Sequence, residues 1–280
     1  MECNRSAADF FGETMDQSLY FASLIITGIT AGTASGLFGV GGGFLMTPVQ
    51  YWLFTSGGMD STLATRLAFG TSLAVMIPTM ISGTFAHHSR GAVNWKAAVP
   101  MGCAAIFGGL SGGTLATHLP GHVLRTIFAI LVIAMAVRMV WHLQSCRVCE
   151  PRGSVGIHLF FGFLIGIISG LAGIGGGILL VPLLVMFLGY PMHTAVGTSS
   201  ACLIFSSAGA VTAYVINGLG VAGLPPYSIG YVDLMTFAIL ATTTIPLARF
   251  GVRCAHGCSG RNLQIIFAVV LILVGAMMLV

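Results

Sequence analysis

The chain has 280 residues, of which 56% are hydrophobic and only 6% are charged, and its mean hydropathy is +0.97. Soluble domains carry about 25% charged residues, so this composition excludes an ordinary water-soluble protein. The net charge of +4 comes from basic residues scattered through short segments, a pattern that does not indicate nucleic-acid binding. Long apolar runs indicate instead a polytopic membrane protein, because a spanning helix needs roughly 20 apolar residues.

The chain begins with a polar tail and continues as apolar runs. Residues 1–18 form the tail, which has acidic residues where a secretory signal peptide would have a basic segment. Residues 144–154 are polar and separate two halves, 19–143 and 155–280. The predicted apolar runs are 19–54, 64–86, 97–117, 123–143, 155–188, 195–216, 231–248 and 263–280.

The two halves share sequence motifs. Residues 36–48 read GLFGVGGGFLMTP and residues 170–182 read GLAGIGGGILLVP, in register at an offset of 134. A Gly-Thr-Ser motif follows in each half, at residues 70–72 and 197–199. Internal repeats of this kind are typical of secondary transporters.

Loop charges predict the direction of each half. Basic residues lie after the second run, around the linker and before the last run, whereas residues 217–230 carry no charge. If the basic loops face the cytoplasm, an even number of crossings must separate them. Three runs lie between the linker and the basic loop at 249–261, so one of these runs must begin and end on the same side.

The run at 155–188 is the natural candidate for this return. As one helix its 34 residues would extend about 51 Å, at about 1.5 Å per residue. The hydrocarbon core is about 30 Å thick, so we expect two shorter half-helices that fold back at the glycines. The same reasoning applies to 19–54. The predicted fold is an all-α integral membrane protein with two inverted repeats, each a broken, glycine-rich re-entrant hairpin followed by three transmembrane helices.

The glycine clusters predict the binding site. A helix that restarts after a break has unpaired N–H groups and the positive end of its dipole, both of which attract an anion. The alternative is that the glycines only allow close helix packing. Hydroxyls of the Gly-Thr-Ser segments could bind an oxyanion or bond to their own helices. The candidate substrate-binding residues are Gly39, Gly41, Gly42, Gly43, Thr71, Ser72, Gly173, Gly175, Gly176, Gly177, Thr198, Ser199 and Ser200.

The doubled glycine motif, each copy followed by Gly-Thr-Ser, resembles the TauE/SafE family of sulfite and sulfonate exporters over essentially the full chain. The resemblance implies a multi-pass permease of the plasma (inner) membrane. It further implies export of oxidised-sulfur anions such as sulfite, sulfoacetate or related organosulfonates. Its partners are then the small anion and the lipid bilayer, and a homodimer is one alternative for its assembly. A passive anion channel or a transporter of another small anion stays open.

The remaining polar residues suggest further roles. Arg66 and His193 each stand four residues before a Gly-Thr-Ser motif and could draw an anion inward, or simply lie at the membrane interface. The acidic residues lie in tails, loops or span ends, so we expect no buried carboxylate for a proton or sodium relay.

Neither a metal nor a cofactor is expected. Metal binding is a weak alternative for four cysteines on the expected cytoplasmic face, where idle thiols are the simpler interpretation. Phe44 and Ile178 stand where a dinucleotide-binding motif needs glycine, and the chain has no phosphate-loop motif, so we expect no enzyme. The four cysteines are Cys146, Cys149, Cys254 and Cys258.

Overall fold

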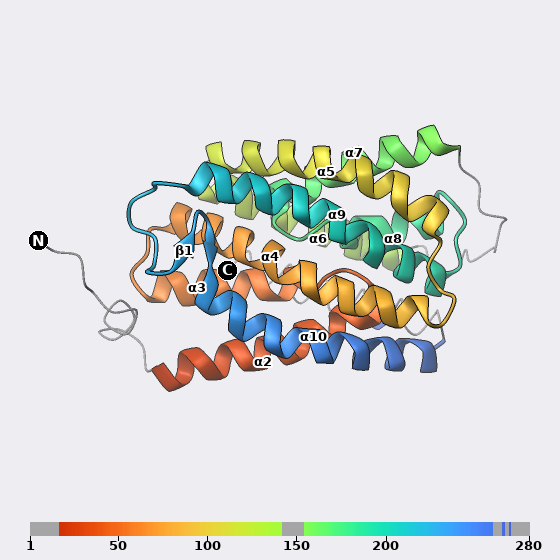
Figure 1. Cartoon of the computed structure of the whole chain (residues 1–280), viewed down its shortest axis with the longest axis horizontal. Helices are drawn as coiled ribbons and strands as arrows, with labels where there is room; N and C mark the ends of the chain where they lie inside the picture. The colour runs from red at the N-terminus through yellow and green to blue at the C-terminus, as the bar shows by residue number, and fades with distance from the viewer. Residues whose placement is uncertain (1–16, 142–153, 260–264, 267–268, 270–280) are drawn as a thin grey trace, which may run out of the picture.

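The protein is an elongated bundle of helices, seen in the computed structural model of Figure 1. The structure describes residues 17–141, 154–259, 265–266 and 269. Nearly all of the predicted linker and of the last predicted run therefore lies outside the described residues. Within the described part, the regular elements are helices apart from one two-stranded ribbon.

The first half contains helices α2 (Gln17–Phe38), α3 (Gly43–Ser56), α4 (Ser61–His88), α5 (Trp95–His118) and α6 (Gly121–Trp141). The second half contains α7 (Val155–Ala172), α8 (Gly177–Met186), α9 (Met192–Gly218) and α10 (Leu234–Gly257). The antiparallel strands β1 (Ser228–Ile229) and β2 (Val232–Asp233) precede α10.

Six of these helices are long and apolar enough to cross a membrane, namely α2, α4, α5, α7, α9 and α10. The prediction of an all-helical integral membrane protein is thus confirmed. The prediction of two half-helices in each hairpin is wrong for the first helix, because α2 has 22 residues and α7 has 18. Only α3, with 14 residues, and α8, with 10, are short. The glycine clusters lie late in their runs, so the breaks divide these runs unequally.

The helices form two three-helix groups. Helices α2, α4 and α10 lie together in the lower part of Figure 1, and α5, α7 and α9 lie together in the upper part. Each group therefore takes two helices from one half and one from the other. Glycine permits the close approach, since a Cβ on Gly36 of α2 would stand 2.0 Å from the carbonyl oxygen of Ala248 in α10.

The directions of the helices follow from their contacts. Gly70 of α4 lies beside Tyr214 near the end of α9, and Gly197 near the start of α9 lies beside His87 at the end of α4. Helices α4 and α9 therefore run in opposite directions. In contrast α4 and α10 run in the same direction, because their final turns meet where His87 Nδ1 lies 3.3 Å from His256 Nε2.

Polar side chains fix where three of the helices begin. Asp60 caps α4 by accepting hydrogen bonds from the backbone N–H groups of Thr62 (2.9 Å) and Leu63 (3.2 Å). Asn94 caps α5 and Asp233 caps α10 in the same way. Such caps satisfy N–H groups that the first turn of a helix leaves unpaired.

Candidate anion site at two glycine loops

Two loops of matching conformation interrupt the helices, one in each half. Residues 39–42 separate α2 from α3, and residues 173–176 separate α7 from α8. In each loop the first, third and fourth residues have positive φ, a conformation that side chains with a Cβ disfavour. Glycine is therefore required at equivalent positions of both loops. The φ values are 65°, 91° and 73° at Gly39, Gly41 and Gly42, and 64°, 80° and 75° at Gly173, Gly175 and Gly176.

The two loops lie against each other. A Cβ on Gly43, the first residue of α3, would stand 3.3 Å from the carbonyl oxygen of Gly173. A Cβ on Gly177, the first residue of α8, would stand 2.5 Å from the Cα of Val40. The N-termini of the two short helices are thus brought together. Their N-cap residues are glycines, so no capping side chain competes for the first-turn donors or for the positive ends of the dipoles.

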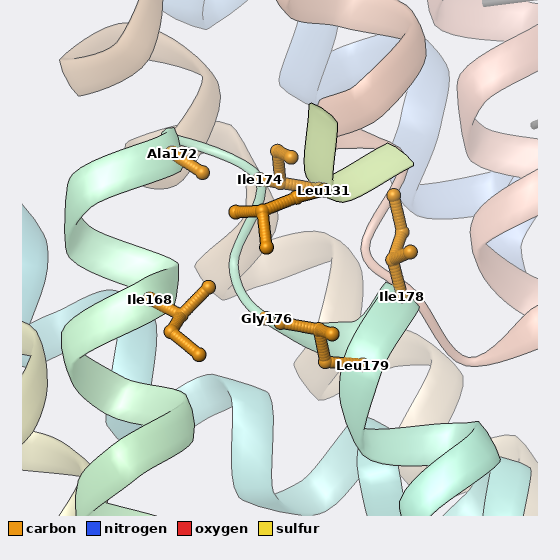
Figure 2. Close-up of a pocket in the computed structure, with 7 residues that line it drawn as sticks. All are labelled: Leu131, Ile168, Ala172, Ile174, Gly176, Ile178 and Leu179. Carbon is orange, nitrogen blue, oxygen red and sulfur yellow. The ribbon is translucent and has the colours of Figure 1, made fainter. Parts of the chain in front are cut away.

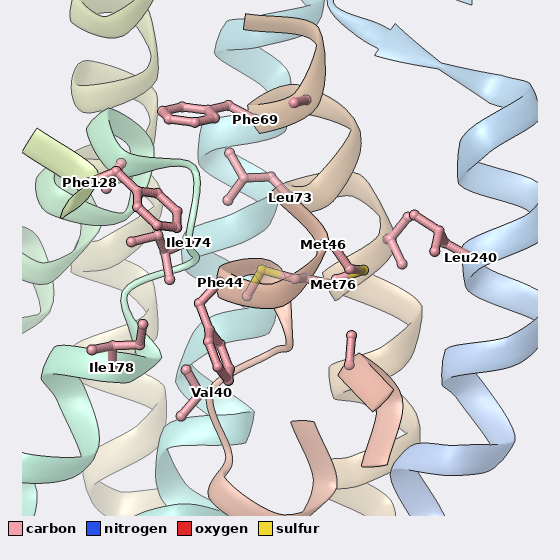
Figure 3. Close-up of a cluster of buried hydrophobic side chains, with 14 of the residues drawn as sticks. Val40, Phe44, Met46, Phe69, Leu73, Met76, Phe128, Ile174, Ile178 and Leu240 are labelled. Carbon is pink, nitrogen blue, oxygen red and sulfur yellow. The ribbon is translucent and has the colours of Figure 1, made fainter. Parts of the chain in front are cut away.

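Met76 of α4 fills the space between the loops. Its Cε would lie 2.0 Å from a Cβ on Gly41 and 1.9 Å from a Cβ on Gly175, and the residue is fully buried. Figure 3 shows Met76 inside the buried cluster, with Val40 and Phe44 from the first hairpin and Ile174 from the second. A flexible thioether side chain therefore lies between the two loops and contacts both.

A very small hollow, of about 10 Å³, lies beside the second loop. Figure 2 shows it between the end of α7, the loop and the start of α8, with Leu131 of α6 on the remaining side. Its lining is apolar apart from the backbone of Gly176, so this hollow is not suited to an anion. It is lined by Leu131, Ile168, Ala172, Ile174, Gly176, Ile178 and Leu179.

The threonines of the Gly-Thr-Ser motifs hold helix starts that belong to the other half. Thr71 Oγ1 accepts a hydrogen bond from the N–H of Asp233 (2.9 Å), the N-cap of α10. Thr198 Oγ1 accepts one from the N–H of Asn94 (3.0 Å), the N-cap of α5. Both hydroxyls thus bind backbone N–H groups. The two bonds correspond to each other, because in each case a threonine of one half holds the start of the equivalent helix in the other half.

The serines of the motifs reach the glycine loops. Ser199 Oγ donates to the carbonyl oxygen of Gly39 (2.9 Å). On the other side Thr47 Oγ1 donates to Ser72 Oγ (3.1 Å) and lies 3.5 Å from the carbonyl oxygen of Gly173. Each loop is therefore supported by a hydroxyl group from the opposite half, Ser199 for the first loop and Thr47 for the second.

Several buried hydroxyls beside the loops escaped the sequence analysis. Ser207 Oγ lies 3.5 Å from the point where a Cβ on Gly175 would stand, and the Cβ of Ser169 lies 3.1 Å from the corresponding point at Gly176. Neither hydroxyl has a hydrogen-bond partner among the described residues. The repeated Ser-Gly pair at residues 35–36 and 169–170 was a usable signal. The buried hydroxyl oxygens without a described partner include Ser35, Ser169, Ser206 and Ser207.

Comparison with known proteins agrees with the motif resemblance. The family model described as sulfite exporter TauE/SafE matches residues 24–278. The chain belongs to the TauE/SafE family. It is therefore a multi-pass membrane transporter by family, and a location in the plasma membrane is consistent with its six apolar helices. The family is one of membrane transporters rather than enzymes, and it implies a small-molecule substrate and contact with membrane lipid.

Three relatives of this TauE/SafE protein are probable membrane transporter proteins. One from Methanocaldococcus jannaschii is 31% identical over 91% of this chain and 94% of its own length. One from Haemophilus influenzae is 28% identical over 89% and 94%, respectively. YunE of Bacillus subtilis is 27% identical over 71% and 79%. No solved structure matches the chain significantly.

Arg66 and His193 of this TauE/SafE protein lie away from the loops, at opposite ends of the bundle. Arg66 Nη1 donates to the hydroxyl of Tyr231 (3.3 Å), and its Nη2 donates to the carbonyl oxygen of Leu119 (3.0 Å). The ring of His193 stacks on that of His256 with centroids 5.0 Å apart. Ser200 Oγ bonds to its own helix, at the carbonyl oxygen of Val196 (2.9 Å).

Asp233 corrects one expectation. This carboxylate is only 2% exposed, so the expectation that the chain holds no buried carboxylate is wrong. Its Oδ2 accepts hydrogen bonds from the hydroxyl and from the backbone N–H of Thr236. The charge is buried because the carboxylate caps the N-terminus of α10. The position of Asp233 at the end of an apolar run did not reveal this role.

The cysteine pairs are only half described. Cys254 and Cys258 are free and half-buried at the end of α10, whereas Cys146 and Cys149 lie outside the described residues. Over the part of the chain that the structure describes, no group of three histidine, cysteine or acidic side chains could hold a metal ion.

Proposed function

We propose that this TauE/SafE protein exports small oxidised-sulfur anions such as sulfite, sulfoacetate or related organosulfonates, by alternating access around the two glycine loops. The observation that carries the proposal is the meeting of two short-helix N-termini beside the buried hydroxyls of Ser169 and Ser207, which have no hydrogen-bond partner in the part of the chain that the structure describes. N–H groups, hydroxyls and helix dipoles stabilise an anion without a fixed counter-charge, so the anion can also leave.

The contacts support two inverted repeats with re-entrant hairpins. Thr71 and Thr198 make equivalent bonds to the opposite half, and the two helices that carry them run in opposite directions. In Figure 1, α2 and α7 also run in opposite directions, as do α5 and α10. Each short helix returns toward the end of the bundle at which its hairpin began, as a re-entrant hairpin requires.

The ends of the helices support the predicted topology. The loop after α4, the start of α7 and the end of α10 lie at the same end of the bundle, and the described basic residues Arg90, Arg249 and Arg253 belong to these segments. The N-terminal end of α2 and the loop before β1 lie at the opposite end. With the basic end in the cytoplasm, the glycine loops would face each other within the membrane.

Met76 sets the closed state of this cycle. Because it occupies the space between Gly41 and Gly175, an anion can enter only when the side chain or one half moves aside. A closed centre favours alternating access over a permanently open channel. Rocking of one repeat against the other would expose the loops to each side in turn.

Thiol labelling tests whether water reaches the space between the loops. In a cysteine-free background, Met76→Cys should react with an anionic methanethiosulfonate, and sulfoacetate should slow that reaction by occupying the same space. The matched control is Leu53→Cys, which lies in α3, is also fully buried and should stay unreactive. An unreactive Met76→Cys, or one that reacts equally fast with and without sulfoacetate, would contradict the site.

Flux measurements separate the carrier from its alternatives. Proteoliposomes offered sulfite, thiosulfate, sulfate and sulfonates should show saturable uptake of the oxidised-sulfur anions. Uptake saturates in a carrier because each bound anion crosses only when the protein changes conformation. Linear flux with measurable single-channel current would instead indicate the passive anion channel. Saturable uptake of only another class of anion would contradict the substrate assignment.

A further inference from the structure

A second polar feature lies outside the glycine loops, where the C-terminal ends of α4 and α10 meet. An open hollow of about 260 Å³ is present there. Three of its lining side chains are arginines, two from α10 and one just past the end of α4. The hollow is lined by Phe85, Ala86, Ser89, Arg90, Arg249, Val252 and Arg253.

Two of the three guanidinium groups are held in place by the protein. Arg90 Nη1 donates to the carbonyl oxygen of Val252 (3.3 Å). Arg249 Nε donates to Ser82 Oγ (3.1 Å), which itself donates to the carbonyl oxygen of Ile245 (2.9 Å). A guanidinium has five N–H donors, so each anchor leaves most donors free for a ligand. Ordinary interfacial arginines that only extend into the headgroup region need no such anchoring.

The charge of the hollow is not balanced within the described part of the chain. The carboxylates described there are Asp60 and Asp233, which cap the N-termini of α4 and α10. Because the hollow lies at the C-terminal ends of the same two helices, both carboxylates are a helix length away. The negative ends of the two helix dipoles offset only part of three positive charges.

We propose that this hollow binds a tetrahedral oxyanion of the phosphate or sulfate type. The planar guanidinium group of arginine can donate two parallel hydrogen bonds to the oxygens of such an anion. Basic residues that only set the orientation of the protein in the membrane do not need to converge on one hollow, as these three arginines do. The anion is either the phosphate of an anionic lipid or a free anion. Phe85 lines the hollow and is 66% exposed, so an aromatic side chain lies beside the arginines where acyl chains would pass.

The experiment compares purified wild type with Arg253→Gln in two arms. Arg253 is exposed and has no hydrogen bond recorded within the described residues, so its removal should leave the fold intact. In the lipid arm, native mass spectrometry measures retention of phosphatidic acid against phosphatidylcholine. In the free-anion arm, calorimetry measures sulfate and phosphate binding to delipidated protein. Lys96→Gln, an exposed charge outside the hollow, is the matched control.

We expect Arg253→Gln to weaken binding about tenfold in one of the arms, and Lys96→Gln to leave it unchanged, because a hydrogen bond between charged groups is strong. A loss confined to phosphatidic acid identifies a lipid site, and a loss confined to free sulfate or phosphate identifies a soluble anion. Equal binding by wild type and Arg253→Gln in both arms, or an equal loss in Lys96→Gln, overturns the proposal. The glycine loops are unaltered in these variants, so failure here leaves the transport proposal untouched.

Discussion

The two glycine loops have the same backbone but different side-chain surroundings. Positive φ recurs at equivalent positions, yet Met76 of the first half reaches both loops, whereas its equivalent in the second half, Leu203, lies against Gly177. The loop at Gly39 accepts a hydrogen bond from the motif serine Ser199 at 2.9 Å, whereas the loop at Gly173 accepts a longer one, 3.5 Å, from Thr47, which also donates to the motif serine Ser72. The backbone is thus shared by both repeats, and one half alone supplies the residue that closes the centre.

This difference separates two requirements of a transporter. Duplicated loops must present the same donors from both sides, so their conformation is the same in the two halves. A closed centre needs a single side chain in the space between them, and two equivalent residues could not both occupy it. Predictions about the backbone should therefore hold equally for both loops, whereas predictions about side chains should differ between them.

The largest effect is expected from Gly42→Leu and Gly176→Leu, each of which should abolish transport. A Cβ at Gly42 would stand 2.6 Å from the carbonyl oxygen of Ala31, and one at Gly176 would stand 2.7 Å from Cγ2 of Ile165. The positive φ adds strain on the order of 1–3 kcal/mol. Sulfite uptake into proteoliposomes is the measurement, with membrane insertion checked by immunoblotting.

Gly220→Leu is the matched control for these two variants. Gly220 has a φ of +77°, but no atom lies within 4 Å of a Cβ placed there. It therefore carries the backbone strain without the collision, and transport should persist. Normal flux in Gly42→Leu with none in Gly176→Leu, or the reverse, would show that the two loops do not act as a pair.

The helix breaks could be predicted from the sequence because they depend on the residues at the break. Glycine alone tolerates repeated positive φ, and a doubled motif makes coincidence improbable. The uneven lengths of the hairpin helices follow from the position of the glycine clusters, which lie late in their runs and leave most of each run to the first helix. The fate of the last run, at residues 263–280, lies outside the described residues.

The partners of the motif residues could not be predicted. The hydroxyl of Thr71 pairs with the backbone of Asp233, 162 positions away. No periodicity or spacing encodes such a bond, because it depends on how two halves pack. Met76 was missed for the same reason, since one methionine in an apolar helix gives no sign of what it faces.

A smaller effect is expected from Thr71→Val and Thr198→Val. Each removes the acceptor of a helix-start N–H group, at Asp233 or Asn94, and should lower the free energy of unfolding by about 1–3 kcal/mol. Thr71→Ser keeps the hydroxyl and should lose much less. Denaturant unfolding in detergent, followed by circular dichroism, measures the difference.

Transport kinetics then distinguish structural from direct roles of these threonines. If their hydroxyls only hold helix starts, the two valine variants should lose stability to a similar extent and keep an unchanged KM for sulfite. A raised KM at unchanged stability would instead indicate that the hydroxyls bind the anion, as the sequence motif first suggested. Unequal losses of stability would mean that the two threonine bonds are not equivalent and that only the glycine loops are alike in the two halves.

The smallest effect separates the two serines, and it is the most direct test of the asymmetry. Ser199→Ala removes a direct bond to Gly39 and should lower the free energy of unfolding by about 1 kcal/mol. Ser72→Ala removes only an acceptor, after which Thr47 can turn its hydroxyl fully to Gly173, so we expect less than about half that loss. The double variant Thr47→Val/Ser72→Ala should restore the full loss, because Gly173 then loses the hydroxyl that donates to its carbonyl oxygen. Equal losses in the two single variants would mean that the loops are held alike and that Met76 alone makes the centre asymmetric.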